Sequence, residues 1–297
     1  MPNAAARVVA IVNPATRGNV PRIVQLLELA APRSTRLEVY LTEYAGHAWE
    51  LARTHALDAG LLVAAGGDGT VAEVAGVARE AGVELGIVPG GSTNIIAREL
   101  GIPTNAHQAI RLIFDDHAIR TIDAGVSGDR TFLHMAGAGM DSLLFDLADP
   151  MLKRKVGWMA YLPAAVKALR RPLSTFTVRA REMTLEGVRS PLVLVANGPS
   201  VIAPLIQLDT RIRFDDGRLD VLVVTATRPV ELARVLARMA MRRMMDSPYV
   251  ESFTTESVEI EADPPIAVQL DGDVAGATPV RFTIDPGSVR IITPRRR

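Results

Sequence analysis

The pattern of hydrophobic and polar positions changes near residue 120. Before that point, short apolar runs alternate with segments whose apolar positions recur at helical spacing, which predicts alternating strands and helices. This order is typical of a parallel α/β sheet. The predicted strands are Arg7–Val12, Arg36–Thr42, Leu61–Ala65 and Glu84–Val88, and the predicted helices are Val20–Ala31, Ala48–Ala59, Val71–Ala81, Asn94–Leu100 and His107–Phe114.

After residue 120 the pattern becomes a series of short β-rich runs separated by turn residues, with helical inserts near Pro150–Leu169 and Pro229–Met245. We interpret this half as a mainly antiparallel β domain. The expected domains are therefore residues 1–120 and 121–287, and the last strand, Val289–Thr293 within residues 288–297, fits either domain. The predicted strands are Arg120–Val126, Thr131–Ala136, Ser174–Ala180, Leu192–Asn197, Leu219–Thr225, Ser257–Glu261, Ala267–Leu270 and Val280–Ile284.

The segment Leu61–Val74 reads as a strand, a glycine-rich loop and a helix. Its loop is Gly66-Gly67-Asp68-Gly69-Thr70, and the spacing of Thr70 and Glu73 predicts a capping box at the helix start. Glycines admit a close ligand, and the free N–H groups of a helix start attract anions. Asp68 beside a phosphate needs a cation, a hydroxyl or a lysine to share, which suggests a nucleotide with Mg²⁺. The alternative is a tight turn that binds nothing.

Three further loops follow predicted parallel strands, and such loops meet at one edge of a sheet. They begin at Asn13, at Thr42 and at Pro89, and the last contains Ser92 and Thr93 before Asn94. Two glycine-rich loops on neighbouring strand ends could clasp one nucleotide. The alternative is a plain turn in which Ser92 or Thr93 caps a helix.

Two aspartate-glycine turns in the β-rich half carry further candidate chemistry. Asp215-Asp216-Gly217 could hold a hard cation through one carboxylate and backbone carbonyls, or form an ordinary hairpin turn. Asp271-Gly272-Asp273 presents the same ambiguity, and Asp273 could act as a general base for an attacking hydroxyl if the fold brings it to the phosphate loop.

Composition limits the classes of partner. Lys and Arg together number 33, equal to Asp and Glu, so no overall basic field favours nucleic acid. The chain has no cysteine, which excludes disulfides, and its histidine spacing makes a zinc site unfavourable. It shows no signal-peptide pattern and no apolar run of roughly 18 residues, so we expect a cytoplasmic protein.

Basic clusters occur at Lys153-Arg154-Lys155, Arg170-Arg171 and between Arg234 and Arg243. The segment Val156–Leu169 lies between the first two and carries Trp158 and Tyr161, which suits peripheral contact with an anionic membrane. The alternative is a helix packed on the β domain with a solvated charged rim.

Taken together, these segments resemble the catalytic domain of diacylglycerol kinases and sphingosine kinases, particularly the bacterial soluble lipid kinases. The resemblance covers nearly the whole chain, and its motifs follow the family's order. They are Asn13-Pro14, Thr42 with Gly46-His47-Ala48, Gly66–Thr70, Pro89–Asn94 with Ala97-Arg98, Asp123-Ala124-Gly125, Asn197-Gly198, Asp215–Asp220 and Asp271-Gly272-Asp273.

The resemblance implies a phosphofructokinase-like or NAD-kinase-like α/β domain, a C-terminal antiparallel β-sandwich and a lipid entering between them. It implies ATP and Mg²⁺ as cofactors, with Mg²⁺ at Asp216 and the backbone carbonyls of Arg213 and Arg218, and Asp273 as base. Asp68 joins Asp273 as a residue expected to be essential for turnover. The implied nucleotide contacts are Asn13, Thr42, Gly66, Gly67, Asp68, Gly69, Thr70, Ser92 and Thr93.

Four positions depart from the family pattern. Asp273 replaces a glutamate one methylene longer, Ile95 replaces an aspartate, Ser92 replaces a threonine with retention of the hydroxyl, and His134 stands where relatives often carry asparagine. A displacement near 1 Å at a catalytic group can cost on the order of 10²-fold in rate.

The expected function is phosphoryl transfer from ATP to a lipid hydroxyl at the inner face of a membrane, with diacylglycerol as acceptor and phosphatidic acid as product. Two alternatives stay open: a kinase of NAD or a sugar phosphate, and a lipid- or nucleotide-binding protein without catalysis. A β-sandwich edge could also pair two subunits into a homodimer.

Overall fold

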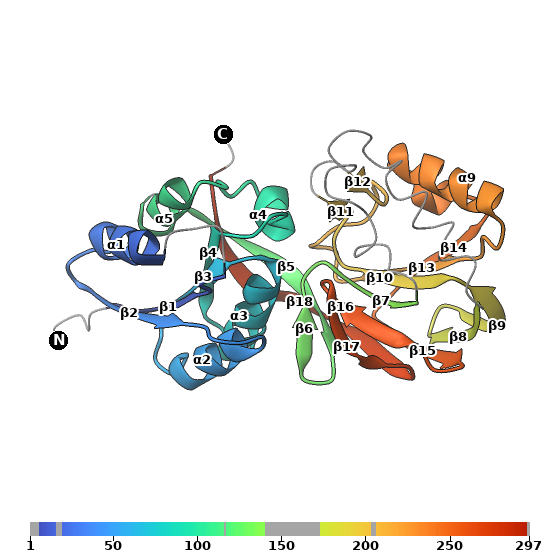
Figure 1. The fold of residues 1–297 in the computed structure, drawn as a ribbon, viewed down its shortest axis with the longest axis horizontal. Helices are drawn as coiled ribbons and strands as arrows, with labels where there is room; N and C mark the ends of the chain where they lie inside the picture. Colours follow the sequence, from blue (N-terminus) through green and yellow to red (C-terminus); the bar gives the residue numbers. More distant parts are fainter. Residues whose placement is uncertain (1–5, 16–19, 116, 140–172, 203–205, 296–297) are drawn as a thin grey trace. The chain divides into compact units, whose positions relative to one another are not determined.

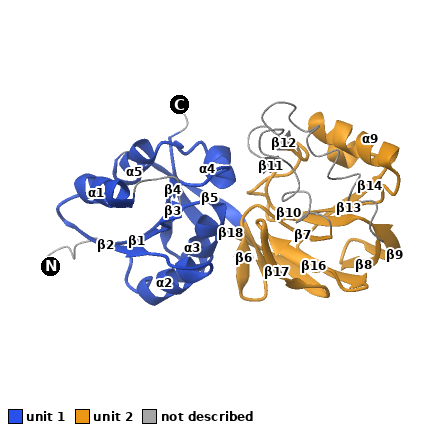
Figure 2. Ribbon diagram, viewed as in Figure 1, with its two compact units in different colours: residues 1–123, 287–297 blue, residues 124–286 orange. Residues whose placement is uncertain are grey.

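The computed structural model describes residues 6–15, 20–115, 117–139, 173–202 and 206–295 of the chain (Figure 1). The chain forms two compact units (Figure 2). Unit 1 comprises residues 1–123 and 287–297, and unit 2 comprises residues 124–286. The C-terminal segment therefore belongs to the same unit as the N-terminal half.

Unit 1 is built on a parallel sheet of strand order β2-β1-β3-β4, to which the end of β18 adds next to β4. The strands are continuously apolar where helices cover both faces, as the sequence pattern predicts. The elements are β1 (Ala6–Val12), α1 (Val20–Ala30), β2 (Thr35–Leu41), α2 (His47–His55), β3 (Leu61–Gly66), α3 (Asp68–Ala81), β4 (Glu84–Pro89), α4 (Ile95–Glu99), α5 (Ala106–Phe114), β5 (Ala118–Ser127) and β18 (Val280–Thr293).

Two pairs of helices enclose this sheet (Figure 1). Helices α1 and α5 bury Ile23, Leu27, Ile110 and Ile113 against one face. Helices α2 and α3 pack together on the other face, and most of α3 is buried. The packing leaves the loops at the carboxyl ends of the strands as the accessible edge of the sheet.

Unit 2 is an antiparallel β-sandwich, and the predicted fold class is confirmed. One sheet has strand order β14-β13-β10-β7-β16-β17, and the other joins β9, β8 and β15 to the beginning of β18. Its elements are β6 (Arg130–Phe132), β7 (Met135–Gly139), β8 (Ser174–Ala180), β9 (Thr184–Ser190), β10 (Leu192–Ala196), β11 (Ser200–Ile202), β12 (Ile206–Gln207), β13 (Leu219–Val224), α9 (Pro229–Ala240), the 3₁₀ helix η2 (Met244–Asp246), β14 (Val250–Thr255), β15 (Ser257–Asp263), β16 (Ala267–Leu270) and β17 (Asp273–Ala277).

Strand β10 shows how the six-stranded sheet is buried on both faces. Val193 and Val195 face the sandwich core, where Phe176 and Phe282 come from the opposite sheet. Leu192 and Leu194 alternate to the outer face, which α9 covers with Leu232, Val235, Leu236 and Met239. Successive side chains of β10 therefore point to opposite faces of the sheet, but the residues on both faces are apolar.

Several predicted element boundaries are wrong. The predicted strand Thr131–Ala136 is two strands, β6 and β7, because the chain bends at Leu133 and His134. The predicted strands Val280–Ile284 and Val289–Thr293 are one continuous strand, β18. The helix predicted to reach Met245 ends at Ala240, before Arg242 adopts a left-handed backbone conformation with φ of 59°.

The predicted helix near Pro150–Leu169 and the basic clusters at 153–155 and 170–171 lie outside the described residues. Among the helices that the structure describes, none combines the length and apolarity needed to cross a membrane.

Candidate nucleotide and catalytic site

The four predicted loops of unit 1 lie at one edge of its sheet, after β2, β1, β3 and β4 in spatial order. Backbone hydrogen bonds extend the sheet into this edge. Thr42 N donates to Val12 O at 3.0 Å, Asn13 N donates to Ala65 O at 2.9 Å and Gly90 N donates to Gly66 O at 2.8 Å. Every residue predicted to contact the nucleotide therefore stands on this edge.

Asn13 connects the first loop to the glycine-rich loop. Its Nδ2 donates to Thr70 Oγ1 at 3.1 Å, and its Oδ1 accepts from Ala15 N at 2.9 Å. Thr70 is buried, and a Cβ on Gly66 would lie 2.5 Å from the Thr70 Cβ. Glycine is therefore required at position 66, because any side chain there would clash with Thr70.

Helix α3 begins at Asp68, with Gly67 as its N-cap, and the capping box predicted from Thr70 and Glu73 is wrong. Thr70 stands inside the first turn, where its hydroxyl meets Asn13. Within the described residues, no side chain caps this helix. Its first-turn N–H groups, which an α-helix leaves without backbone partners, can serve an anion.

Asp68 joins the two glycine-rich loops. Its Oδ2 accepts from Thr93 Oγ1 at 2.8 Å, and its Oδ1 accepts from Ile95 N at 2.6 Å. Of the partners expected for Asp68, which were a cation, a hydroxyl or a lysine, the structure shows the hydroxyl of Thr93, and it adds the backbone N–H of Ile95. Ile95 contributes its backbone N–H to this link, which does not depend on the side chain at position 95.

The second glycine-rich loop is shaped by Asn94, which has a left-handed φ of 48° and is the N-cap of α4. Its side chain exchanges two hydrogen bonds with the backbone of Gly91, each 2.9 Å long. Ser92 and Thr93 are therefore not caps of this helix. Gly91 lies so close to the first loop that a Cβ there would come within 2.8 Å of Gly67 Cα.

Glu73 has a role that its sequence position does not reveal. Its two carboxylate oxygens accept from Gly46 N at 3.2 Å and Trp49 N at 3.1 Å, so Glu73 caps α2 from the neighbouring helix α3. Gly46 provides no side chain to cap α2. The clue in the sequence is the absence of a capping residue before His47, and the partner could be found only from the fold.

In unit 2, the Asp271-Gly272 turn joins β16 to β17, with both residues at positive φ as a two-residue hairpin loop requires. The carboxylate of Asp271 accepts from the backbone N–H groups of Leu133, His134 and Met135 at 2.7, 2.9 and 2.9 Å. Asp273 begins β17 and is exposed. Of these two acids, Asp273 has the accessible carboxylate.

The predicted magnesium turn lies before β13. Asp216 Oδ1 accepts from Arg218 N at 3.1 Å, and the side chain of Arg213 pairs with Asp215. Among the described residues, no cluster of three or more acidic or histidine side chains could hold a metal ion. A cation here would rely on one carboxylate and backbone carbonyls.

Asp220, four residues beyond Asp216, provides a test of whether these residues fit a cation. Burial, together with the charges of Asp216 and Asp209, raises the pKa of Asp220 to about 7. Its Oδ2 is buried and has no hydrogen-bond partner in the described part of the chain. Arg211 already offsets the charge of Asp209, so the remaining negative charge is that of Asp216 and of Asp220 when ionised. A buried acid without a hydrogen-bond partner beside Asp216 fits a divalent cation, because a cation would offset the charge of these two carboxylates.

His134 is almost fully buried, with its ring edge against Phe214 at a centroid distance of 6.1 Å. Burial lowers the pKa of His134 to about 3, and its Nε2 has no hydrogen-bond partner among the described residues. Its carbonyl accepts from the N–H groups of Asn197 and Gly198, each at 2.9 Å. His134 is thus a neutral interior residue.

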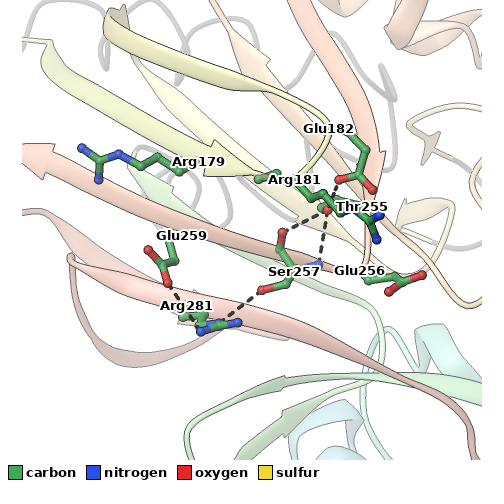
Figure 3. Close-up of a pocket in the computed structure, with 9 residues that line it drawn as sticks. Arg179, Arg181, Glu182, Thr255, Glu256, Ser257, Glu259 and Arg281 are labelled. Carbon is green, nitrogen blue, oxygen red and sulfur yellow. Dashed lines mark hydrogen bonds and ion pairs between the residues drawn. The ribbon is translucent and has the colours of Figure 1, made fainter.

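A groove of about 300 Å³ in unit 2 is lined by residues of β8, the end of β14, β15, the start of β18 and adjoining loops (Figure 3). None of the residues predicted for the site lines it. Most of its charged groups have partners: Arg281 pairs with Glu259 at 3.6 Å, Arg179 pairs with Glu261 at 2.6 Å, and Glu182 accepts a hydrogen bond from Thr255 at 2.5 Å. We therefore exclude this groove from the candidate site.

Comparison with known proteins covers both units. Residues 7–126 match the family described as diacylglycerol kinase catalytic domain, and residues 134–293 match the family described as YegS C-terminal NAD kinase beta sandwich-like domain. A "Probable lipid kinase YegS-like" of Pseudomonas aeruginosa is 32% identical over 78% of this chain and 76% of its own length.

Two further relatives differ in how much of their length is matched. A diacylglycerol kinase of Staphylococcus haemolyticus is 25% identical over 93% of this chain and 83% of its own length. An uncharacterized protein of Synechocystis is 28% identical over 78% of this chain, and the match spans 54% of that protein. A diacylglycerol kinase structure from Bacillus anthracis superposes with a TM-score of 0.73 at 21% identity, covering 98% of this chain and 97% of that one, and so supports the fold.

Proposed function

Because this chain belongs to the bacterial YegS-like lipid kinase and diacylglycerol kinase family, we propose that it transfers the γ-phosphoryl group of ATP to a lipid hydroxyl, with diacylglycerol as the acceptor. The observation that carries this proposal is the pair of glycine-rich loops joined by Asp68, within the segment that matches the catalytic domain. The product with diacylglycerol is phosphatidic acid.

The glycine-rich loops would bind the phosphates of ATP. The N–H groups at the start of α3 stabilise negative charge there, and Asp68 keeps the second loop against the first. Gly67 and Gly91 allow the loops to approach without side chains between them. Thr42 and Asn13 fix the neighbouring strand ends.

Asp216, with the backbone carbonyls of Arg213 and Arg218, would hold Mg²⁺, and Asp220 would add negative charge beside it. When bound, Mg²⁺ supplies positive charge that offsets the negative charge of the nearby carboxylates.

Asp273 would act as the general base. It takes the proton of the lipid hydroxyl while the hydroxyl oxygen forms a bond to the γ-phosphorus and the bond from that phosphorus to the β–γ bridging oxygen breaks, releasing ADP. The exposed carboxylate at the start of β17 is compatible with this task, whereas that of Asp271 is engaged with three backbone N–H groups.

The choice of diacylglycerol follows the names of the relatives, which include diacylglycerol kinases from two genera. The β-sandwich family is described as NAD kinase-like, which favours NAD as the competing acceptor. The two acceptors predict different labelled products.

The test is incubation of the purified protein with γ-labelled ATP, Mg²⁺ and separate acceptors: diacylglycerol, monoacylglycerol, ceramide, a sphingoid base, a glycolipid and NAD. Labelled phosphatidic acid is expected, and identification of the product by mass spectrometry fixes the acceptor. Label found only in phosphorylated NAD would identify NAD, and not a lipid, as the phosphoryl acceptor. ATP and liposome binding without label in any acceptor would reject catalysis.

A further inference from the structure

Tyr44 presents an exposed aromatic ring at the nucleotide edge of unit 1. It lies two residues after Thr42 in the loop between β2 and α2, and 54% of its surface is exposed. An aromatic ring exposed to this extent is a large apolar surface for a loop to leave in water. None of the predicted nucleotide contacts uses it.

The ring is held in place on one face and at its tip. It stacks on His47 with the ring centroids 4.4 Å apart and the planes 1° from parallel. Its hydroxyl donates to Glu50 Oε2 at 2.7 Å, and His47 Nδ1 accepts from Glu43 N at 3.1 Å. A ring fixed in this way loses little side-chain entropy when a ligand covers its second face.

The loop that carries Tyr44 is also tied to the phosphate-binding helix. Glu73 stands in α3, and its carboxylate accepts from Gly46 and Trp49 on either side of the start of α2. The position of Tyr44 is therefore fixed relative to the glycine-rich loop at the beginning of α3.

The contacts around that loop restrict where a nucleoside can extend. On the β4 side, Gly91 packs against Gly67, and Thr93 is bonded to Asp68. On the β1 and β2 side stand Asn13, Thr42 and then Tyr44. In the described part of the chain, no other aromatic contact covers the second face of Tyr44.

We propose that Tyr44 is a base-binding residue, on whose exposed face the adenine of ATP stacks while His47 supports the opposite face. This inference rests on the proposed nucleotide site and adds to it the residue that contacts the base. Stacking is tolerant of base identity, because every base has a π-face. Tyr44 should therefore strengthen binding of purine nucleotides in general.

The experiment compares the binding of ATP and of inorganic tripolyphosphate by calorimetry in the presence of Mg²⁺. We expect Tyr44→Ala to weaken ATP binding by about 10-fold or more while tripolyphosphate binding stays unchanged, since only ATP carries a base. Tyr44→Trp should preserve or strengthen ATP binding. Leu57→Ala is the matched control, because Leu57 is 78% exposed and lies before β3, at the other end of that strand.

Unchanged ATP affinity in Tyr44→Ala would overturn the inference, and so would an equal loss for ATP and tripolyphosphate, which would indicate collapse of the loop. Wild-type protein without measurable ATP affinity would overturn it as well. A wild type that binds ATP through Tyr44 but labels no lipid would leave the stacking contact established and reject the lipid kinase proposal.

Discussion

Three aspartates in glycine-containing turns have different environments, and the environment decides what each can do. Asp68 is engaged by Thr93 and Ile95, and Asp271 by three consecutive backbone N–H groups. Asp273 is exposed, and its side chain makes no hydrogen bond within the described residues. A carboxylate available to accept a proton is therefore found at one of these three positions.

Asp273→Asn should abolish lipid phosphorylation without altering the fold. Removing a general base costs roughly 10²–10⁴-fold in rate, and asparagine preserves the size of the side chain. The measurements are the rate of phosphatidic acid formation and the urea midpoint of unfolding. Asp129→Asn, an exposed acid in the β5–β6 turn, is the control and should retain normal turnover. A turnover near that of the wild type in Asp273→Asn would reject Asp273 as base.

Asp271→Asn should instead destabilise the protein. Asparagine tolerates the left-handed backbone at this position, where φ is 49°, but loses the negative charge that three N–H groups share. We expect the free energy of unfolding to fall by about 1–3 kcal/mol. Urea denaturation measures this change, and equal stability of Asp271→Asn and Asp273→Asn would contradict the distinction between the two acids.

The sequence identifies Asp271 and Asp273 as candidate functional acids, but it does not show which one is bound by backbone N–H groups and which one is exposed. The assignment of Asp271 depends on the pairing of β16 with β7, which brings residues 133–135 beside it from 136 or more positions away. Local spacing carries no information about such a contact.

At the scale of elements, the strands of the α/β half agree closely with the predictions from the hydrophobic pattern. The helix predicted over Ala48–Ala59 ends at His55 instead, and the predicted helix caps are wrong. The predicted strand Glu84–Val88 differs from β4 by one residue. In contrast, the capping box predicted from the spacing of Thr70 and Glu73 is wrong. Helix α3 begins at Asp68, two residues before Thr70, and the carboxylate of Glu73 caps the start of α2. Strand periodicity is enforced by burial, whereas a carboxylate accepts any well-placed N–H group.

The contact between the two glycine-rich loops predicts unequal effects of alanine at Gly91 and Gly67. A Cβ on Gly91 would come within 2.8 Å of Gly67 Cα, a backbone atom that cannot move without its loop. A Cβ on Gly67 would lie an ordinary 3.5 Å from Gly91 Cα. We expect Gly91→Ala to lower the free energy of unfolding by about 1–3 kcal/mol.

Gly67→Ala is the matched control and should have a smaller effect on stability, since its φ of −83° also suits alanine. Thermal unfolding of the two variants without nucleotide makes the comparison. A Gly91→Ala protein as stable as the wild type would show that the loops are not in close contact.

For the whole molecule, the course of the chain through the units was harder to predict than the units' fold classes. Strand β18 contributes residues 280–286 to unit 2 and residues 287–293 to unit 1, where Arg290 and Ile291 pair with β4. The sequence shows Pro286-Gly287 in its middle, which predicts a turn between two strands. Pairing on both sides of this dipeptide overrides the local signal.

Between pH 3.8 and 6.5, His134 and Asp220 should make the free energy of unfolding depend on pH in opposite directions. In this interval unfolded His134 binds a proton that the folded protein, with a pKa of about 3 at His134, does not hold, so His134 makes stability rise with pH. Folded Asp220, with its pKa raised to about 7, retains a proton that the unfolded chain has released above pH 3.8, so Asp220 makes stability fall with pH.

Each slope approaches about 1.4 kcal/mol per pH unit, and the two largely cancel while both residues are present. The free energy of unfolding of each variant minus that of the wild type should therefore change with pH. From pH 4 to pH 6 this difference should fall for His134→Asn and rise for Asp220→Asn. Urea unfolding at pH 4, 5 and 6 in buffer with a chelator measures both differences, since bound cations would stabilise the ionised form of Asp220. Differences of the same sign in the two variants would contradict the opposite burial effects, because burial disfavours the positive charge of one residue and the negative charge of the other.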